Sequence, residues 1–508
     1  MSNLSDLIPA GGGQNNTDFV ADGTIASGKP VVLTAAGKAA PVAQSGAGLG
    51  TPVQFETGAI DNGHISTIYD PDEQKIVVAY SDNGNSGYGT AVVGTMSSDT
   101  SLSFGTPVVF ESADVQAISA CYDTAADKTV IVYADNGNSS YGTGIVGTVS
   151  GTSISFGSAT VFASAADSRV NCCIFEPNSG KVVVASKQII AATNYGKAHV
   201  ATVSGTSISF ATETTFLSSS APEYIAMALD PDNSNQILLC FRNDGSSGNG
   251  TAIVTAVSGT STTFGTPVVY AAVSTYSTQV VYDTVQNKHV IFYSNGSNNY
   301  DGKVIVGTTS GTSVSFGSAA TWKTGVGYQG VYYTGACWDS TNNRIPIAYC
   351  FDNWAAPANS YSYVLSATLD SGGTVTFSSE TQFESGATTV VSGNGGNFAA
   401  FDTNQGSMAY AYQDNTDSNT GYALGWQATS TNLTSTNLLG IAAGAISDTA
   451  TGTINTWGSR NEVQTSLTIG SDYYVQSDGT ITTTSTSPAQ LIGKAISATQ
   501  INIKDYTG

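Results

Sequence analysis

Seven acidic residues recur along the chain, each directly after an aromatic or large apolar residue. They follow one another at intervals of 53, 53, 54, 53, 56 and 63 residues. Clustered carboxylates can act as the acid and base of a glycosidase, or they can hold a calcium ion. A catalytic acid, however, needs to appear only once or twice, whereas a residue required by the same turn recurs in every unit. We therefore interpret the seven acids as turn-capping residues: Asp70, Asp123, Glu176, Asp230, Asp283, Asp339 and Asp402.

A second group of residues with binding chemistry lies in the polar segment that follows the second apolar run of each unit. These segments mix Tyr with Asn, Asp and Ser, which together supply flat amphipathic contact area and adaptable hydrogen bonds. Sugar rings and protein surfaces both suit such a surface, although Asn-Gly-rich hairpin tips also occur simply to turn the chain. The candidate binding residues are Tyr88, Tyr141, Tyr195, Tyr300, Tyr361, Tyr422, Asn83 and Asn136.

The same segments contain aspartates beside further oxygen donors, so calcium at an individual tip is an alternative to our expectation of no metal and no cofactor. No EF-hand pattern occurs. The three histidines, His64, His199 and His289, stand alone, with neither a GxSxG nor an HExxH motif. We therefore predict no catalytic residues and no enzymatic activity. The aspartates in question are Asp82, Asp135, Asp244, Asp352 and Asp414.

The elements that must position these residues are short β-strands. The unit from Ala113 to Phe162 contains four strand-like stretches, and the second of them, at 129–135, is almost continuously apolar. Such a strand needs cover on both faces. The first stretch carries small residues, such as Ala120 and Cys121, just before its acid. Small side chains suit the crowded hub of a β-propeller. This taper favours a propeller over a linear solenoid.

The fourth stretch of units one to six ends in an aromatic residue, and unit seven has none. The same pattern precedes unit one and ends at Phe55. We therefore predict an all-β chain whose core is a seven-bladed β-propeller of four-stranded blades, closed by an N-terminal strand. Rings of six or eight blades and a solenoid are alternatives. Unit six departs from the pattern with an insertion at 352–361 and with Pro346 in its second strand, which predicts a bulge.

Residues 1–46 and 431–508 do not fit the repeat, but both contain short strand-like runs around Asp-Gly turns. Closing a ring brings its two ends together. We therefore predict that these segments pack as one small β-domain, with the propeller inserted between them at 47–430.

Composition narrows the possible partners. The net charge of -21 would repel nucleic acid, so we expect no nucleic-acid partner. The sequence contains no run of 18 apolar residues, so we expect no membrane insertion. The first residues lack the basic start and apolar segment of a secretory signal. The cysteines lie in apolar strand-like runs without CxxC spacing, which predicts buried free thiols: Cys121, Cys172, Cys173, Cys240, Cys337 and Cys350.

The terminal segments 1–42, 466–481 and 491–503 resemble those of structural proteins from tailed-phage virions, especially marine and cyanobacterial phages. The repeat typified by VSGTSISFGSATVF at 149–162 is similar to repeats in their tail-fibre-like proteins. The resemblance implies a component of the virion, made in the host cytoplasm, without assigning its position. Our leading hypothesis is a non-enzymatic tail fibre or appendage component.

On this resemblance the flanking domain would bind other virion proteins. The propeller would contact a glycan or protein of the host cell surface, and the chain would form a homo-oligomer in the particle. The alternatives are a glycan-binding or glycan-hydrolysing propeller and a capsid-decorating protein.

Overall fold

The chain divides into two compact units. A computed structural model describes residues 15–45, 48–218, 220–233, 236–327, 329–353, 360–385, 388–389, 398–434, 436–485 and 490–504. One unit is formed by residues 47–428, and the other by residues 1–46 together with 429–508. We call the second one the flanking unit. The sequence predicts these divisions at 46/47 and 430/431, and the second one lies two residues earlier in the structure.

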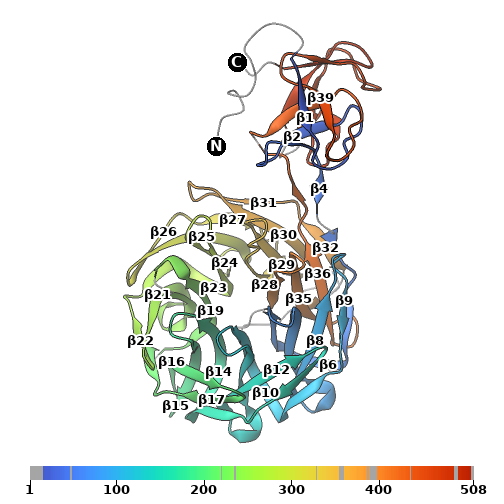
Figure 1. Ribbon diagram of the computed structural model, residues 1–508. Coiled ribbons are helices and arrows are strands. Elements are labelled where there is room, and N and C mark those ends of the chain that lie inside the picture. The colour runs from blue at the N-terminus through green and yellow to red at the C-terminus, as the bar shows by residue number, and fades with distance from the viewer. Residues whose placement is uncertain are drawn as a thin grey trace. The chain divides into compact units, whose positions relative to one another are not determined.

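Both units are built from antiparallel β-strands, as expected. In the described residues the only helical elements are 3₁₀ turns of three residues. None of the described helices is long and apolar enough to cross a membrane. Figure 1 shows that the strands of residues 48–427 are arranged in a ring of small sheets, which is a β-propeller.

Blade 2 shows how one sheet is made. Its inner strand is the second half of β10 (Val108–Asp123), which pairs with β11 (Lys128–Asp135), and β11 pairs with β12 (Tyr141–Ser150). The outer edge is shared by two segments, because β13 (Ser153–Phe156) covers one half of β12 and the start of β14 (Thr160–Glu176) covers the other. The rest of β14 then becomes the inner strand of blade 3. Long strands of this kind connect neighbouring blades.

The same order of pairing recurs in seven groups of strands within the described residues. The remaining strands of blades 1 and 3 are β6 (Val53–Asp70), β7 (Lys75–Asp82), β8 (Tyr88–Met96), β9 (Leu102–Phe104), β15 (Lys181–Ile190), β16 (Thr193–Ser204), β17 (Ser207–Phe210) and β18 (Thr214–Leu217). Those of blades 4 and 5 are β19 (Pro222–Asp230), β20 (Gln236–Asn243), β21 (Asn249–Ser258), β22 (Ser261–Phe264), β23 (Val268–Asp283), β24 (Lys288–Asn295), β25 (Asp301–Ser310), β26 (Ser313–Phe316) and β27 (Ala320–Lys323). Those of blades 6 and 7 are β28 (Gln329–Ala336), β29 (Ile345–Asn353), β30 (Tyr361–Leu369), β31 (Val375–Phe377), β32 (Thr381–Ser385), β33 (Thr388–Thr389), β34 (Ala399–Asp402), β35 (Ser407–Asp414), β36 (Thr420–Gln427) and β5 (Gly48–Leu49).

The last blade is completed by the front of the chain. Strand β36 pairs with the start of β6, with Tyr422 opposite Gln54, and its end pairs with β5. Phe55 lies on Gly421, where any Cβ would be 2.5 Å from the phenyl ring, so only glycine fits. The N-terminal strand expected from the sequence therefore occupies the outer edge of this sheet.

Aromatic side chains join each blade to the next. Phe110, from the outer edge of blade 1, packs against Tyr133 and Phe156 of blade 2 with ring centroids 5.2 and 5.6 Å apart. Phe55 makes the same contacts with Tyr80 and Phe104, at 5.2 and 5.7 Å. The aromatic residues counted in the sequence thus act between blades, and the contact across the closing pair repeats the others.

The inner strands also bond to one another directly. Ser66 Oγ accepts a hydrogen bond from the Ala120 amide at 3.0 Å, and Ser119 Oγ accepts one from Cys173 at 3.1 Å. The small residues expected at the hub permit this approach. All six cysteines are free, as predicted. Five of them are buried, and Cys337 is only partly buried.

The bulge expected at Pro346 is not present. Residues 345–351 of β29 pair with β30 without a register shift. The Pro346 carbonyl faces the inner strand and accepts from Cys337 at 3.2 Å, so the missing N–H of proline also faces that side. The ladder loses one bond there, and β28 ends at Ala336 rather than continuing to Asp339. Proline shortens the inner strand and leaves the second strand regular.

The flanking unit combines both ends of the chain. In its first sheet Phe19 lies opposite Gly452, and its core includes Val32, Trp457 and Ile492. The two sheets and a short connecting pair are formed by β1 (Asn16–Val20), β39 (Thr451–Asn455), β38 (Leu438–Ala442), β2 (Pro30–Leu33) and β3 (Ala39–Pro41); by β40 (Arg460–Asn461), β44 (Ile501–Ile503), β43 (Gln490–Ala495), β41 (Asp472–Val475) and β42 (Ile481–Thr482); and by β4 (Gln44–Ser45) with β37 (Ser430–Thr431).

Candidate functional site

The seven recurring acids cap turns, as interpreted from the sequence. Asp123 Oδ1 accepts hydrogen bonds from the amides of Ala125 and Ala126, at 2.9 and 3.0 Å. The longer Glu176 does the same with both carboxylate oxygens, at 2.7 and 2.9 Å from Asn178 and Ser179. The other acids repeat the Asp123 pattern, and all seven are buried. Burial raises the pKa of Asp70 and Asp402.

The six predicted loop tyrosines are all half-buried, but they do not form one equivalent set. Tyr88, Tyr141 and Tyr361 begin the third strand of their blades, whereas Tyr195 lies two residues into β16. Tyr422 lies two residues into β36, and its hydroxyl donates to Asp417 at 2.7 Å. These differences arise because the connecting segments differ in length between blades.

Tyr300 occupies a different place from the other five. It lies in the turn before β25 and has a left-handed backbone, with φ of 53°. Its ring points toward tyrosines of the inner strands, with centroids 5.2 Å from Tyr276 and 4.7 Å from Tyr332. Of the predicted residues, Tyr300 is therefore the one whose aromatic neighbours come from more than one blade.

The two predicted asparagines have different surroundings. Both begin 3₁₀ turns, Asn83–Asn85 and Asn136–Asn138, which are capped by Asp82 and Asp135. Asn136 donates to Asp114 at 2.5 Å and accepts from Ser140 at 2.8 Å, whereas Asn83 is exposed. The side chain of Asn136 is thus already bonded to Asp114 of β10 and to Ser140.

The loop aspartates also have local partners. Asp352 accepts from Ser360 at 2.6 Å, Asp414 accepts from the Thr416 amide at 2.8 Å, and Asp244 pairs with Arg242 at 2.7 Å. In the part of the chain that the structure describes, no group of three or more His, Cys, Asp and Glu side chains could hold a metal ion.

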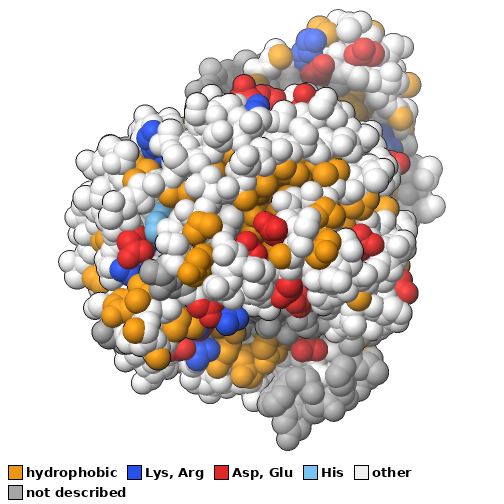
Figure 2. Space-filling model, turned by 90° about the horizontal axis from the view of Figure 1, so that it is seen from below, with side chains coloured by type: hydrophobic (Ala, Val, Ile, Leu, Met, Phe, Trp, Pro, Cys, Tyr) orange, Lys and Arg blue, Asp and Glu red, His pale blue; other side chains and the backbone are white. Residues whose placement is uncertain are grey.

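Each of the four arginines in the sequence faces an acid. Arg169 pairs with Asp167 at 2.7 Å, and Arg460 pairs with Glu462 in the flanking unit. Arg344 is buried, with its Nε 2.9 Å from Asp339. On the face shown in Figure 2, basic side chains are few and scattered. Each arginine is therefore neutralised by a nearby carboxylate, and the arginines do not form a basic patch.

The histidines are structural. His64 Nδ1 accepts from the Ala117 amide at 2.9 Å. Burial lowers the pKa of His199 and of His289 to about 4, so both are neutral at pH 7. Neither ring nitrogen of His289 has a hydrogen-bond partner.

One cluster was missed by sequence reasoning. Tyr224, Tyr276, Tyr300 and Tyr332 follow one another across blades 4, 5 and 6, with successive ring centroids 5.5, 5.2 and 4.7 Å apart. The guanidinium of Arg242 lies over the Tyr276 ring, 4.4 Å from its centroid. We call these five residues the tyrosine belt. Aligning the units on their acids would have shown that tyrosine replaces smaller or more polar residues at the start of these inner strands.

The belt is held by backbone features of the inner strands. Tyr276 and Tyr332 each directly precede a register shift in the pairing with the second strand. Tyr224 follows such a position and has φ of 51°, which is uncommon for a bulky residue. Glycines permit this packing, because a Cβ on Gly296 would lie 2.4 Å from the Tyr276 ring and one on Gly330 would lie 2.4 Å from the Cβ of Tyr300.

The charges at the belt are matched in pairs. Arg242 is held by Asp244 at 2.7 Å, and Lys187 of blade 3 forms an ion pair with Glu223 of blade 4. Glu223 is in turn opposite Arg242 in the strand pairing. The belt therefore offers aromatic faces and hydrogen-bonding groups with no excess of either sign among these ion pairs.

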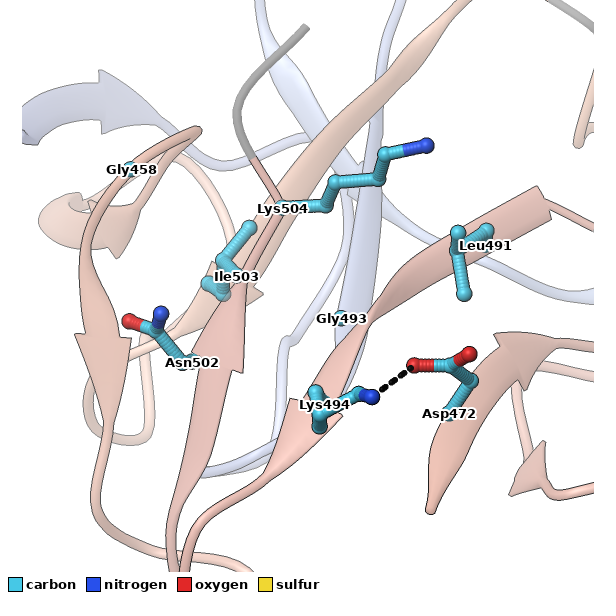
Figure 3. Close-up of a pocket in the computed structure, with 8 residues that line it drawn as sticks. All are labelled: Gly458, Asp472, Leu491, Gly493, Lys494, Asn502, Ile503 and Lys504. Atoms are coloured by element: carbon cyan, nitrogen blue, oxygen red, sulfur yellow. Dashed lines mark ion pairs between the residues drawn. The ribbon is translucent and has the colours of Figure 1, made fainter. Parts of the chain in front are cut away.

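The flanking unit contains a shallow pocket of about 460 Å³. Figure 3 shows the Lys494 side chain directed toward Asp472, with which it pairs at 3.6 Å, while Leu491 and Ile503 lie on neighbouring strands. Both charged side chains are exposed, by 59% for Lys494 and by 50% for Asp472. This pocket lacks a buried polar group that could orient a small ligand.

Comparisons with known proteins give only distant matches. No protein-family model and no curated protein matches the sequence. A solved structure of the leech intramolecular trans-sialidase shares 9% identity at a TM-score of 0.41, covering 75% of this chain and 69% of its own. A variant of the NanB sialidase of Streptococcus pneumoniae shares 9% at 0.44, covering 74% and 70%. A protein from Lactobacillus plantarum shares 9% at 0.42, covering 78% and 100%.

Proposed function

We propose that this protein is a non-enzymatic structural component of a tailed-phage virion, a tail fibre or appendage part. In this proposal a closed seven-bladed propeller is displayed toward the host cell surface, and the flanking unit binds other virion proteins. The observation that carries the proposal is that the chain forms two separate compact units. Residues 16–20 pair with residues 451–455 in the flanking unit, while the propeller closes on itself through β36 and β6. The resemblance of the terminal segments to virion proteins supports the same assignment.

Exposed apolar side chains support an attachment role for the flanking unit. Among the described residues it contributes four of the nine large hydrophobic residues that are exposed, although it is about a quarter of the chain. Ile469 is 67% exposed, and its neighbour Gly470 bonds to Ala495, directly before the exposed Ile496. Ile469 and Ile496 are thus brought close together, and contiguous exposed apolar side chains mark protein-binding surfaces. The four residues are Val20, Val463, Ile469 and Ile496.

The chemistry of the propeller supports a role without turnover. Its recurring acids are bonded to turn amides, its arginines face acids, and its most buried histidines are neutral. A hydrolase needs an acid and a base in environments that separate their pKa values at one site. The tyrosine belt contains no such pair of carboxyl groups.

Antibody labelling of intact particles tests this proposal. Antibodies raised against residues 47–428 should decorate the tail fibres or appendages of the phage that encodes this chain. Label over the capsid would instead favour the capsid-decorating alternative, and absence of label from intact and disrupted particles would overturn the proposal. Antibodies against the flanking unit serve as the matched control, because they should bind strongly only after the particle is disrupted. Native mass spectrometry of the released component checks the expected homo-oligomer.

A reducing-sugar assay tests the non-enzymatic part of the proposal. The purified chain should release no sugar from host cell-surface glycans. Time-dependent release that is lost on heat denaturation would contradict it.

A further inference from the structure

The tyrosine belt departs from the repeat. Blades 2 and 3 carry Gln116 and Ser168 at the last paired position before the shift in the inner strand, where blades 5 and 6 carry Tyr276 and Tyr332. The fold therefore does not need an aromatic residue there. Residues that the fold does need, such as the acid caps, occur in every blade. Among the described residues this aromatic cluster lies in three adjacent blades, and it is left to be explained by something other than folding.

Backbone strain strengthens this argument. Blade 2 places Ala117 and blade 5 places Ser277 in the left-handed conformation that Tyr224 adopts in blade 4, with φ of 49°, 48° and 51°. A large side chain in this region is unfavourable, and such strain persists mainly at functional sites. Tyr300 has the same kind of backbone, with φ of 53°. Two of the four rings are therefore held in place at a cost that a smaller residue would reduce.

The four rings suit an uncharged ligand with apolar faces and hydrogen-bonding groups. Successive rings are inclined by 69°, 60° and 34°, so they present separate faces rather than one flat platform. All four rings are half-buried, so their positions are set by packing while part of each remains accessible. Tyrosine presents an apolar face and a polar hydroxyl, and it loses little conformational entropy on binding. Arg242 is already stacked on Tyr276 and paired with Asp244, so its remaining N–H groups can donate hydrogen bonds without bringing net charge to the site.

Charge decides between neutral and ionic ligands. The neighbouring ion pairs, Arg242 with Asp244 and Lys187 with Glu223, are each balanced. The chain as a whole carries a net charge of -21, which repels polyanions at long range. An acidic ligand therefore gains nothing at this surface, whereas a neutral sugar ring can stack its C–H face on tyrosine and bond through its hydroxyls.

We propose that the tyrosine belt, Tyr224, Tyr276, Tyr300 and Tyr332 with Arg242, is a binding site for uncharged carbohydrate. This inference rests on the proposed function, since it gives the chemical class of the host-surface ligand that the propeller contacts. The site extends over blades 4 to 6 and engages successive sugar residues of an oligosaccharide, because adjacent tyrosines present several aromatic contacts rather than one.

A glycan array probed with the full-length chain tests the site. The array carries neutral oligosaccharides of glucose, galactose, mannose, fucose and N-acetylglucosamine beside sialylated and sulfated ones. We expect binding to at least one neutral oligosaccharide. Tyr276→Ala and Tyr300→Ala should each weaken that binding at least tenfold, while Tyr276→Phe, which keeps the ring, should retain it within about threefold.

Tyr122→Ala is the matched control, because Tyr122 is a half-buried tyrosine on the inner strand of blade 2 and lies outside the belt. It should leave binding within twofold, and circular dichroism should show that every variant is folded. Binding to no neutral glycan, stronger binding to the acidic ones, or an equal loss in Tyr122→Ala would overturn the inference. Antibody labelling of particles is independent of this result, so a failed glycan site with labelled virions sinks only the inference, and glycan binding without labelled virions sinks only the proposed function.

Discussion

Blades 2 and 5 follow the same backbone course but carry different residues where the backbone leaves a choice. Both inner strands contain a register shift, with a left-handed residue at Ala117 in one and at Ser277 in the other. Before the shift, blade 2 has Gln116 and blade 5 has Tyr276. At the start of the second strand, blade 2 has Thr129 and blade 5 has the buried His289.

What the two blades share is what each blade needs to close its turns and join its neighbours. Asp123 and Asp283 cap equivalent turns, and Gly142 and Gly302 both lie under the aromatic residue of their outer strand. The comparison teaches that repeated residues maintain the ring. Residues that are not repeated can instead serve binding, or can lower the stability of the fold under some conditions. Four predictions test that division, in order of decreasing effect.

The largest effect is expected where a repeated aromatic residue is removed. Phe110→Ala should lower the free energy of unfolding by about 3–5 kcal/mol, because a buried ring is lost from between two blades. Phe55→Ala should cost a similar amount, since Phe55 makes the equivalent contacts across the closing pair. Urea unfolding measures both. A cost below about 1 kcal/mol for Phe55→Ala alone would mean that the N-terminal strand does not hold the last blade in solution.

The second prediction concerns His289, which blade 2 replaces by Thr129. Burial lowers the pKa of His289 from 6.5 to about 4, so the unfolded chain binds a proton at a higher pH than the folded chain does. Stability contributed by the neutral ring is therefore present above pH 6.5 and lost as the pH falls toward 4, by up to about 3 kcal/mol. His289→Phe should reduce this loss between pH 8 and pH 5 in urea unfolding. His199→Phe is a control that should reduce it similarly, because the pKa of His199 is also about 4. An unchanged pH dependence in both variants would show that these rings do not remain buried and neutral.

The third prediction returns to the shared turns. Asp123→Ala and Asp283→Ala should each cost about 1–2 kcal/mol of unfolding free energy, because two turn amides lose their acceptor. Asp123→Asn keeps an acceptor oxygen and should cost less than half as much. Chemical denaturation of the matched pairs measures these values. Clearly different costs in blades 2 and 5 would break the equivalence of the repeated positions.

The smallest stability effect is expected in the tyrosine belt. Tyr276→Ala removes a half-buried ring that blade 2 does without, so it should cost only about 1 kcal/mol, well below Phe110→Ala. Thermal and urea unfolding of the two variants give the comparison directly. A cost as large as that of Phe110→Ala would show that Tyr276 is needed for folding, and would remove the main reason for assigning it to a ligand.

The repeated parts of this fold can be predicted from the sequence, because each repeated residue meets a structural requirement of its own unit or of the next one. An acid at a fixed interval caps a turn, a continuous apolar run needs two covered faces, and Phe55 stands in a pattern that unit seven lacks. Five of the six cysteines are buried for the same reason, since they lie in apolar runs of the inner or second strands. The bulge predicted at Pro346 is wrong. The neighbouring strand toward which the missing N–H of Pro346 points depends on the register of the folded sheet, which the sequence does not show.

The composition of the candidate site was decided by tertiary structure. Tyr224, Tyr276 and Tyr332 belong to three different inner strands, and nothing local marks them as neighbours. Only Tyr300 was among the residues selected from the loops, while Tyr88 and Tyr141 begin the third strands of their blades and lie outside the cluster. The sequence by itself determined the period, the caps and the strand that completes the last blade, because those follow from interactions within or between consecutive units. Which side chains meet across blades 4 to 6 was set by the curvature of the ring and by left-handed residues in the strands, which no single unit reveals.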